Sequence, residues 1–124
     1  MIAVDTSSLS ALFAGEHGKD VDTLADSLAR GDVRLPPVVL TEILSDPAAA
    51  KVLTPRLLEL ELLDIGEGYW QRAGEARARL RARGLKAKVA DALIAQSCID
   101  HDVALITRDQ DFRHFAKHCG LSLA

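Results

Sequence analysis

The chain has 124 residues, of which 48% are hydrophobic and 27% charged, a composition that supports one folded domain over residues 1–124 and excludes intrinsic disorder. Its formal net charge of −3 does not mark a nucleic-acid binder, although such an average can conceal a local basic stretch. No apolar run approaches the ~18 residues of a membrane span, so we expect a soluble, cytoplasmic protein without membrane contact.

Short apolar segments alternate with longer amphipathic ones along the chain. From the N-terminus we predict a strand over 2–4, helices over 7–14 and 20–30, a strand over 33–35, and a helix over 38–45 that Asp46-Pro47 ends. A helix over 54–60, a weak strand over 61–65, helices over 67–83 and 88–100, a strand over 103–106, a helix over 111–118 and a strand over 121–123 follow. This alternation predicts a three-layer α/β/α fold with a central, mainly parallel sheet.

Two aspartates follow predicted strands. Asp5 comes directly after the strand over 2–4, and Asp109 comes shortly after the strand over 103–106. Open parallel sheets bind ligands beyond the C-terminal ends of their strands, so both acids are expected at one edge of the sheet. Each could instead serve only as a helix cap or a turn residue, which is a common role of aspartate.

Two further acids lie among apolar neighbours on predicted helices. Asp91 points away from the polar face of its helix, which is formed by Gln96, Ser97 and Asp100. Burying an unpaired carboxylate is unfavourable, so Asp91 needs a partner unless it caps the start of the helix. Glu42 is placed similarly on its own helix, where it could alternatively reach solvent or pair with an arginine.

These four acids, Asp5, Glu42, Asp91 and Asp109, are therefore expected to converge on one place. Two carboxylates ~5 Å apart repel each other by about 3 kcal/mol at an effective dielectric constant of ~20. The site must then hold protons or a hard cation, and oxygen-only ligands favour Mg²⁺ or Mn²⁺ over zinc. An acidic site of this kind indicates phosphate chemistry, in which the metal polarises a phosphodiester and activates water.

Four short segments occur in order along the chain: residues 2–7 (IAVDTS), 40–44 (LTEIL), 90–95 (ADALIA) and 105–112 (LITRDQDF). Together they resemble the PIN-domain ribonucleases, and in particular the VapC-like toxins of type II toxin–antitoxin systems. The resemblance covers essentially the whole chain. It implies a single PIN domain that acts as a metal-dependent endoribonuclease, a hydrolase that cuts RNA phosphodiester bonds and leaves a 5′-phosphate and a 3′-hydroxyl.

The resemblance also implies roles for individual residues. The metal-binding and catalytic acids would be Asp5, Glu42, Asp91 and Asp109. Asp111 is a rival for the fourth position, and hydroxyls that position an acid or a water would come from Thr6, Ser7 and Thr107. Such toxins usually dimerise and are silenced by a small antitoxin, so the implied partners are RNA, a cognate antitoxin and a second copy, in a homodimer or a toxin–antitoxin hetero-oligomer.

A basic stretch occupies residues 71–90, where seven basic residues and one acid give a local charge of +6. The candidates for RNA binding are Arg77, Arg79, Arg81, Arg83, Lys86 and Lys88. Spacings of four residues along a helix would let pairs of arginines contact successive phosphates. The stretch could instead be a solvated helix face or a surface for an acidic partner.

Other classes of protein explain less of the sequence. His114 and His118 have a spacing that can bind zinc, but the glutamate of an HExxH motif is absent. A receiver-like phosphoacceptor domain would need an acidic pair after the first strand, where this chain has Asp5 alone. A noncatalytic PIN-type module that binds RNA or a partner is the other alternative. Cys98 and Cys119 are expected to be core residues rather than a disulfide or a zinc site.

Overall fold

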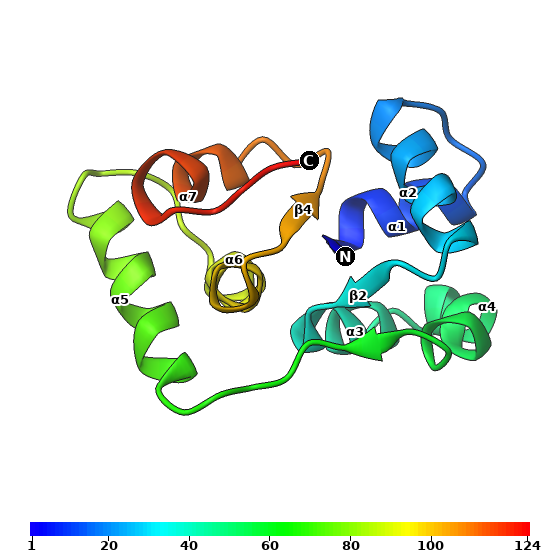
Figure 1. The fold of residues 1–124 in the computed structure, drawn as a ribbon, viewed down its shortest axis with the longest axis horizontal. Helices are drawn as coiled ribbons and strands as arrows, with labels where there is room; N and C mark the ends of the chain where they lie inside the picture. The colour runs from blue at the N-terminus through cyan, green and yellow to red at the C-terminus, as the bar shows by residue number, and fades with distance from the viewer.

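Strands and helices alternate along residues 1–124 in the computed structural model (Figure 1). The strands are β1 (Ile2–Val4), β2 (Val33–Leu35), β3 (Glu61–Leu62) and β4 (Ala104–Ile106). The helices are α1 (Thr6–Phe13), α2 (Lys19–Ala29), α3 (Pro37–Leu44), α4 (Pro47–Leu57), α5 (Tyr69–Arg81), α6 (Val89–His101) and α7 (Phe112–Cys119). The alternation expected from the sequence is confirmed, with two exceptions described below.

The four strands form one parallel sheet in the order β3-β2-β1-β4. The first strand is therefore central, with Ile2 opposite Val33 of β2 and Ala104 of β4. Its C-terminal end meets the C-terminal end of β4, where Val4 lies opposite Ile106. The sheet thus brings the residues that follow β1 and β4 to one edge, although about a hundred residues separate them in the chain.

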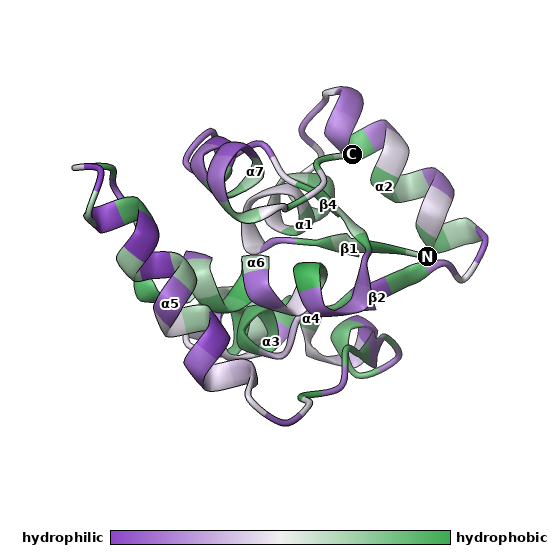
Figure 2. Cartoon of the chain, turned by 60° about the vertical axis from the view of Figure 1, so that its left-hand side comes forward, coloured by the Kyte–Doolittle hydropathy of each residue, from purple (hydrophilic) through white to green (hydrophobic).

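Helices cover both faces of the sheet, which confirms the three-layer α/β/α architecture. Helix α2 packs against β2 and β4, while α6 packs against β4 and lies beside α3, α5 and α7. Figure 2 shows hydrophobic residues concentrated in the central strands and hydrophilic residues along α5. The core is aliphatic, and its fully buried side chains include Leu9, Leu24, Leu35 and Leu105. Burying each such side chain contributes roughly 1.5–3 kcal/mol.

Helix α4 corrects one prediction, because it covers Pro47–Leu57 rather than 54–60. The Asp46-Pro47 pair does not only end the preceding helix but also begins this one. The Asp46 side chain accepts hydrogen bonds from the backbone N–H groups of Ala48 and Ala49, and Pro47 occupies the first turn. Aspartate as the N-cap with proline directly after it is a favourable helix start.

The strand predicted over 121–123 is reduced to a single bridge between Leu123 and Leu105. At this position β4 pairs with the C-terminal segment only through Leu105, whose N–H donates to the Ser122 carbonyl and whose carbonyl accepts from the Ala124 N–H. None of the seven helices has the length and apolar character that crossing a membrane requires.

The polar face expected on α6 is largely buried, because α5 packs over it. Gln96 and Ser97 are 5% and 1% exposed, and only Asp100 reaches the surface. The Tyr69 hydroxyl of α5 donates to the Leu93 carbonyl at 2.6 Å and accepts from the Ser97 hydroxyl at 3.4 Å. Both cysteines are free thiols, with Cys98 buried and Cys119 half-buried, in agreement with the prediction.

Candidate metal centre

Acidic side chains from four separate segments line one cavity of about 270 Å³. They come from the end of β1, from α3, from the first turn of α6 and from the loop between β4 and α7, and are Asp5, Glu42, Asp91 and Asp109. The cavity lies beyond the C-terminal ends of β1 and β4, where a parallel α/β sheet holds its ligands. The structure thus brings together the four acids singled out in the sequence.

Asp5 is the most completely hydrogen-bonded of these acids. The Ser7 hydroxyl donates to both of its carboxylate oxygens at 2.8 Å, the Ser8 N–H donates to Oδ1 at 3.1 Å, and the Thr107 hydroxyl donates to Oδ2 at 2.5 Å. Asp5 therefore caps α1 and faces the cavity at the same time. Burial raises the pKa of Asp5, against the opposing effect of these hydrogen bonds.

Asp91 is buried without such partners. Its side chain is 8% exposed, and Oδ2 has no hydrogen bond within the protein. It does not cap α6, although it lies in the first turn, where the helix dipole favours negative charge. Burial, with a further contribution from Asp109, raises the pKa of Asp91 to about 6. A buried carboxylate oxygen without a donor, directed at other acids, fits the ligand of a hard divalent cation.

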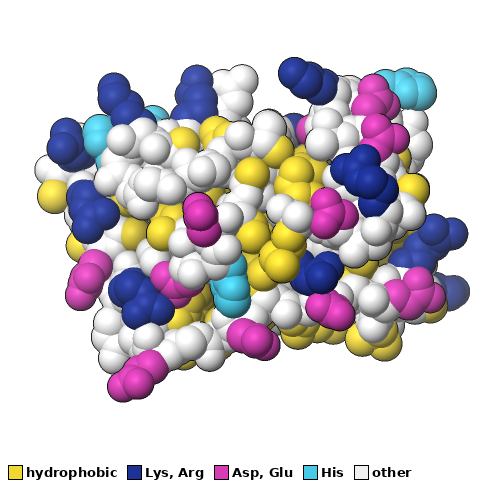
Figure 3. Space-filling model, in the orientation of Figure 1, with side chains coloured by type: hydrophobic (Ala, Val, Ile, Leu, Met, Phe, Trp, Pro, Cys, Tyr) yellow, Lys and Arg dark blue, Asp and Glu magenta, His cyan; other side chains and the backbone are white.

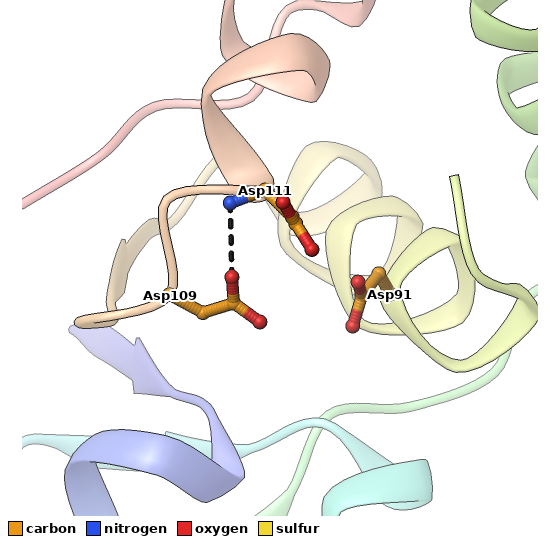
Figure 4. A group of neighbouring side chains, drawn as sticks. All are labelled: Asp91, Asp109 and Asp111. Carbon is orange, nitrogen blue, oxygen red and sulfur yellow. Dashed lines mark hydrogen bonds between the residues drawn. The ribbon is translucent and has the colours of Figure 1, made fainter. Parts of the chain in front are cut away.

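The rivals for the fourth position, Asp109 and Asp111, both lie close to Asp91. One carboxylate oxygen of each of the three residues lies within 4.8 Å of the others (Figure 4). The Asp111 N–H donates to Asp109 Oδ1 at 2.9 Å, which closes a tight turn before α7. Asp111 also forms an ion pair with Lys86 at 3.2 Å, while Asp109 lines the cavity. Asp109 and Asp111 are therefore both close to Asp91 and differ in their other contacts, since only Asp111 is paired with a lysine and only Asp109 lines the cavity.

The three hydroxyls expected near the site hold its acids in place. Thr6 donates to Glu42 Oε1 at 2.8 Å, whereas Ser7 and Thr107 both donate to Asp5. The Thr107 hydroxyl also accepts from the Asp109 N–H at 3.0 Å, which connects the β1 acid to the β4–α7 loop. Oxygen atoms are the only potential ligands among these side chains, and such a set suits Mg²⁺ or Mn²⁺.

The basic stretch does not form one uniform surface. Arg77 donates to the Ala87 carbonyl at 2.8 Å, Lys86 pairs with Asp111, and Lys88 lines the acidic cavity. The remaining three side chains are exposed and form no ion pair; we call Arg79, Arg81 and Arg83 the arginine run. In Figure 3 lysine and arginine side chains gather at the upper left of the molecule, over the part where Figure 1 places α7 and α5.

Two residues line the cavity although the sequence patterns did not predict them there. Ser10 lines the cavity and lies one helical turn after Thr6 on the same face of α1, so helical spacing could have identified it. Lys88 was expected to bind RNA from a surface, yet it directly precedes α6 at the rim of the acidic group. Only the packing of α6 against β4 brings this residue to the cavity.

A three-layer α/β/α fold with a parallel sheet holds its ligands beyond the C-terminal ends of the strands, and here that position is a cavity lined by acids, whose oxygen atoms suit a divalent cation. The family profile described as PIN domain matches residues 2–118, and the chain belongs to the PIN-domain family. PIN domains are generally nucleases and typically use divalent metals. The family predicted from the sequence is therefore confirmed.

Two solved structures have the same fold over their whole length. The structure of VapBC2 from Rickettsia felis bound to a DNA fragment from their promoter superposes with a TM-score of 0.75 at 23% identity, over 100% of this chain and 98% of that one. FitAcB from Neisseria gonorrhoeae superposes with a TM-score of 0.70 at 22% identity, over 99% and 96% of the two chains. A comparison with curated protein sequences finds no match.

Proposed function

We propose that this chain is a Mg²⁺-dependent endoribonuclease and the toxin of a toxin–antitoxin pair. The observation that carries the proposal is the buried, unpartnered Oδ2 of Asp91 among converging acids. Four ionised carboxylates around one cavity would destabilise the fold unless a cation or protons balanced them. Membership of a family that generally cleaves nucleic acids makes a phosphodiester the natural substrate.

The residues at the cavity would divide the work between them. Asp91, Asp109 and Asp111 would hold the ion, since their oxygens lie within 4.8 Å of one another. A bound divalent ion supplies Lewis-acid stabilisation of the negative charge that develops on the scissile phosphate.

Glu42 and Lys88 have the features required for proton transfer and for substrate binding. Thr6 fixes Oε1 of Glu42, and Oε2 has no hydrogen bond within the protein, so it can accept a proton from the attacking water. The Lys88 ammonium at the rim would attract a substrate phosphate into a cavity that otherwise repels anions. Asp5 accepts hydrogen bonds from Ser7, Ser8 and Thr107. It would thereby fix the start of α1 relative to the loop that follows β4.

The assignment to a toxin–antitoxin pair rests on fold similarity. Both solved structures with the same fold, VapBC2 and FitAcB, are those of toxin–antitoxin complexes. We therefore propose that the partners of this chain are an RNA substrate, a cognate antitoxin, and a second copy in a homodimer or a toxin–antitoxin hetero-oligomer.

An RNA cleavage assay tests the enzyme directly. Wild type and Asp91→Asn would be compared on structured RNA with Mg²⁺ and with EDTA, after removal of any copurified antitoxin. We expect Asp91→Asn to lower the cleavage rate about 1,000-fold, equivalent to roughly 4 kcal/mol of transition-state stabilisation. Asp102→Asn is the matched control, because Asp102 is exposed at the opposite end of α6 in a left-handed conformation that asparagine tolerates.

The outcomes separate the alternatives. Cleavage that persists in EDTA, or that Asp91→Asn leaves unchanged, would contradict the proposed site. If neither RNA cleavage nor stabilisation by Mg²⁺ against heat were observed, the noncatalytic binding module would be the better description.

A further inference from the structure

An arginine fork attaches the loop between β4 and α7 to the start of α2. Arg108 Nε donates to Asp20 Oδ2 at 2.9 Å, and Nη2 donates to Asp20 Oδ1 at 3.0 Å, across 88 residues of sequence. Nη2 also donates to the His17 carbonyl at 3.3 Å. Parallel bonds of this kind are stronger and more directional than a single contact between charges. They hold the pKa of Asp20 at about 2.

Asp20 is bonded to α1 as well as to the loop. The fully buried Ser8 hydroxyl donates to Asp20 Oδ2 at 2.7 Å, and the Ser8 N–H donates to Asp5 Oδ1 at 3.1 Å. On the loop side, the Arg108 N–H donates to Ser7 Oγ at 3.3 Å, and Ser7 in turn donates to Asp5. The contacts form a closed ring that leads from Asp20 through both neighbouring segments to Asp5.

The backbone at Gly18 is shaped for this contact. A Cβ atom on Gly18 would lie 2.6 Å from Asp20 Oδ1 and 3.1 Å from Arg108 Nη2. The residue also has φ of +152°, a conformation that side chains rarely adopt. Glycine therefore provides the space in which the fork closes, and any larger residue would push the carboxylate away from the guanidinium.

We propose that Asp20 is a positioning residue, which holds the 107–111 loop through Arg108 and thereby sets how closely Asp109 and Asp111 approach Asp91. Asp20 itself does not line the acidic cavity, so it acts only through its partners. The inference rests on the proposed function, because it requires a divalent ion at these three acids. Their mutual repulsion pushes the loop away from α6, and the Asp20–Arg108 fork opposes that movement before the ion binds.

The test is the affinity for Mn²⁺ alone, measured by isothermal titration calorimetry on the full chain. We expect Asp20→Asn to weaken Mn²⁺ binding about tenfold, which is the low end of the effect of removing an outer contact to a metal ligand, because Asp20 acts through Arg108 and does not touch a ligand itself. Asp100→Asn is the matched control. Asp100 accepts an equivalent arginine fork, from Arg72 Nε at 3.0 Å and Nη2 at 2.7 Å, on the far side of α6. This control should leave the Mn²⁺ affinity unchanged.

Gly18→Ala provides a second variant that keeps every charge. It should also weaken Mn²⁺ binding, because its methyl group displaces the Asp20 carboxylate. Combining Arg108→Gln with Asp20→Asn should weaken Mn²⁺ binding little more than Asp20→Asn alone, since both changes remove the same fork. Arg108→Lys, which keeps the positive charge, should weaken binding less than Arg108→Gln.

Three results of the Mn²⁺ titrations would overturn the positioning role of Asp20. If the wild type binds Mn²⁺ and Asp20→Asn binds it equally well, the positioning role is wrong while the metal centre stands. If Asp100→Asn weakens binding as much as Asp20→Asn, the effect is a general loss of stability and the positioning role is again overturned. If the wild type binds no Mn²⁺, the proposed function fails and this inference fails with it.

Discussion

The acids of the cavity come from segments as distant as residues 5 and 109. The arginine run, in contrast, lies within five consecutive residues at the end of α5 and directly after it. Asp5 and Asp91 are buried, so their charges reduce the stability of the fold unless something compensates them. The arginines are exposed and surrounded by water, so their charges have little effect on the stability of the fold. Buried charge therefore argues for a ligand far more strongly than exposed charge does.

The largest effect that would sharpen this comparison separates Asp109 from Asp111, the two loop acids of the proposed ion site. We expect Asp109→Asn to lower kcat/KM for RNA about 100-fold and Asp111→Asn only about tenfold, which corresponds to about 2.7 and 1.4 kcal/mol. Asp109 lines the cavity, whereas the charge of Asp111 is already balanced by Lys86. Steady-state kinetics of both variants would check this, and a larger loss in Asp111→Asn would reverse their roles.

A smaller effect contrasts the two buried acids in the metal-free protein. We expect Asp5→Asn to lower the free energy of unfolding by about 1–3 kcal/mol, because an amide nitrogen cannot accept the bonds that Ser7 or Thr107 donates. Asp91→Asn should raise it by about 1 kcal/mol, because one repulsive charge disappears and no hydrogen bond is lost. Urea denaturation in EDTA measures both changes, with Asp102→Asn as the control.

The contribution of Asp91 to the free energy of unfolding should also depend on pH. The pKa of Asp91 is about 6 in the fold against an ordinary value of 3.8, so the native state binds more protons than the unfolded state between these values. The contribution of Asp91 to stability is then greatest in acid and is lost as the pH rises from about 3.8 to 6. The stabilising effect of Asp91→Asn should grow over this range and level off above it. An effect independent of pH would contradict the assignment.

The last effect concerns the arginine run. Replacing Arg79 and Arg83 with alanine should weaken RNA binding about tenfold and reduce the slope of log affinity against log salt by about 1.4, as expected for two lost phosphate contacts on a single strand. Mn²⁺ affinity should not change. Arg77→Ala is the informative comparison, since it removes a hydrogen bond to the Ala87 carbonyl and should affect stability instead. An unchanged salt slope would assign the arginine run to a protein partner.

Much of this architecture follows from local sequence patterns. The apolar segment 2–4 and the apolar segment 103–106 predict buried parallel strands, and the acids after them predict an edge site. Asp91 was identified because it interrupts an apolar helix face, and its burial without a hydrogen-bond partner agrees with that reasoning.

The features that sequence patterns missed depend on tertiary contacts. The same Asp46-Pro47 pair can end one helix and begin another, and only the path of the chain decides that it does both. Gln96 and Ser97 look solvent-facing until α5 covers them. The Asp20–Arg108 fork spans 88 residues and two polar positions that carry no local signal, so no periodicity could reveal it.

The central position of β1 has a consequence for the order of folding. β1 is made before β4, with which it pairs, and Asp5 receives a hydrogen bond from Thr107, which is 102 residues away. At translation rates of about 5–20 residues per second, the whole segment between β1 and Thr107 must emerge from the ribosome before these partners exist. Parallel pairings between distant segments are also slow to form. The acid-lined cavity is therefore incomplete in a nascent chain until the segment that carries Thr107 and Asp109 has been made and has packed beside β1.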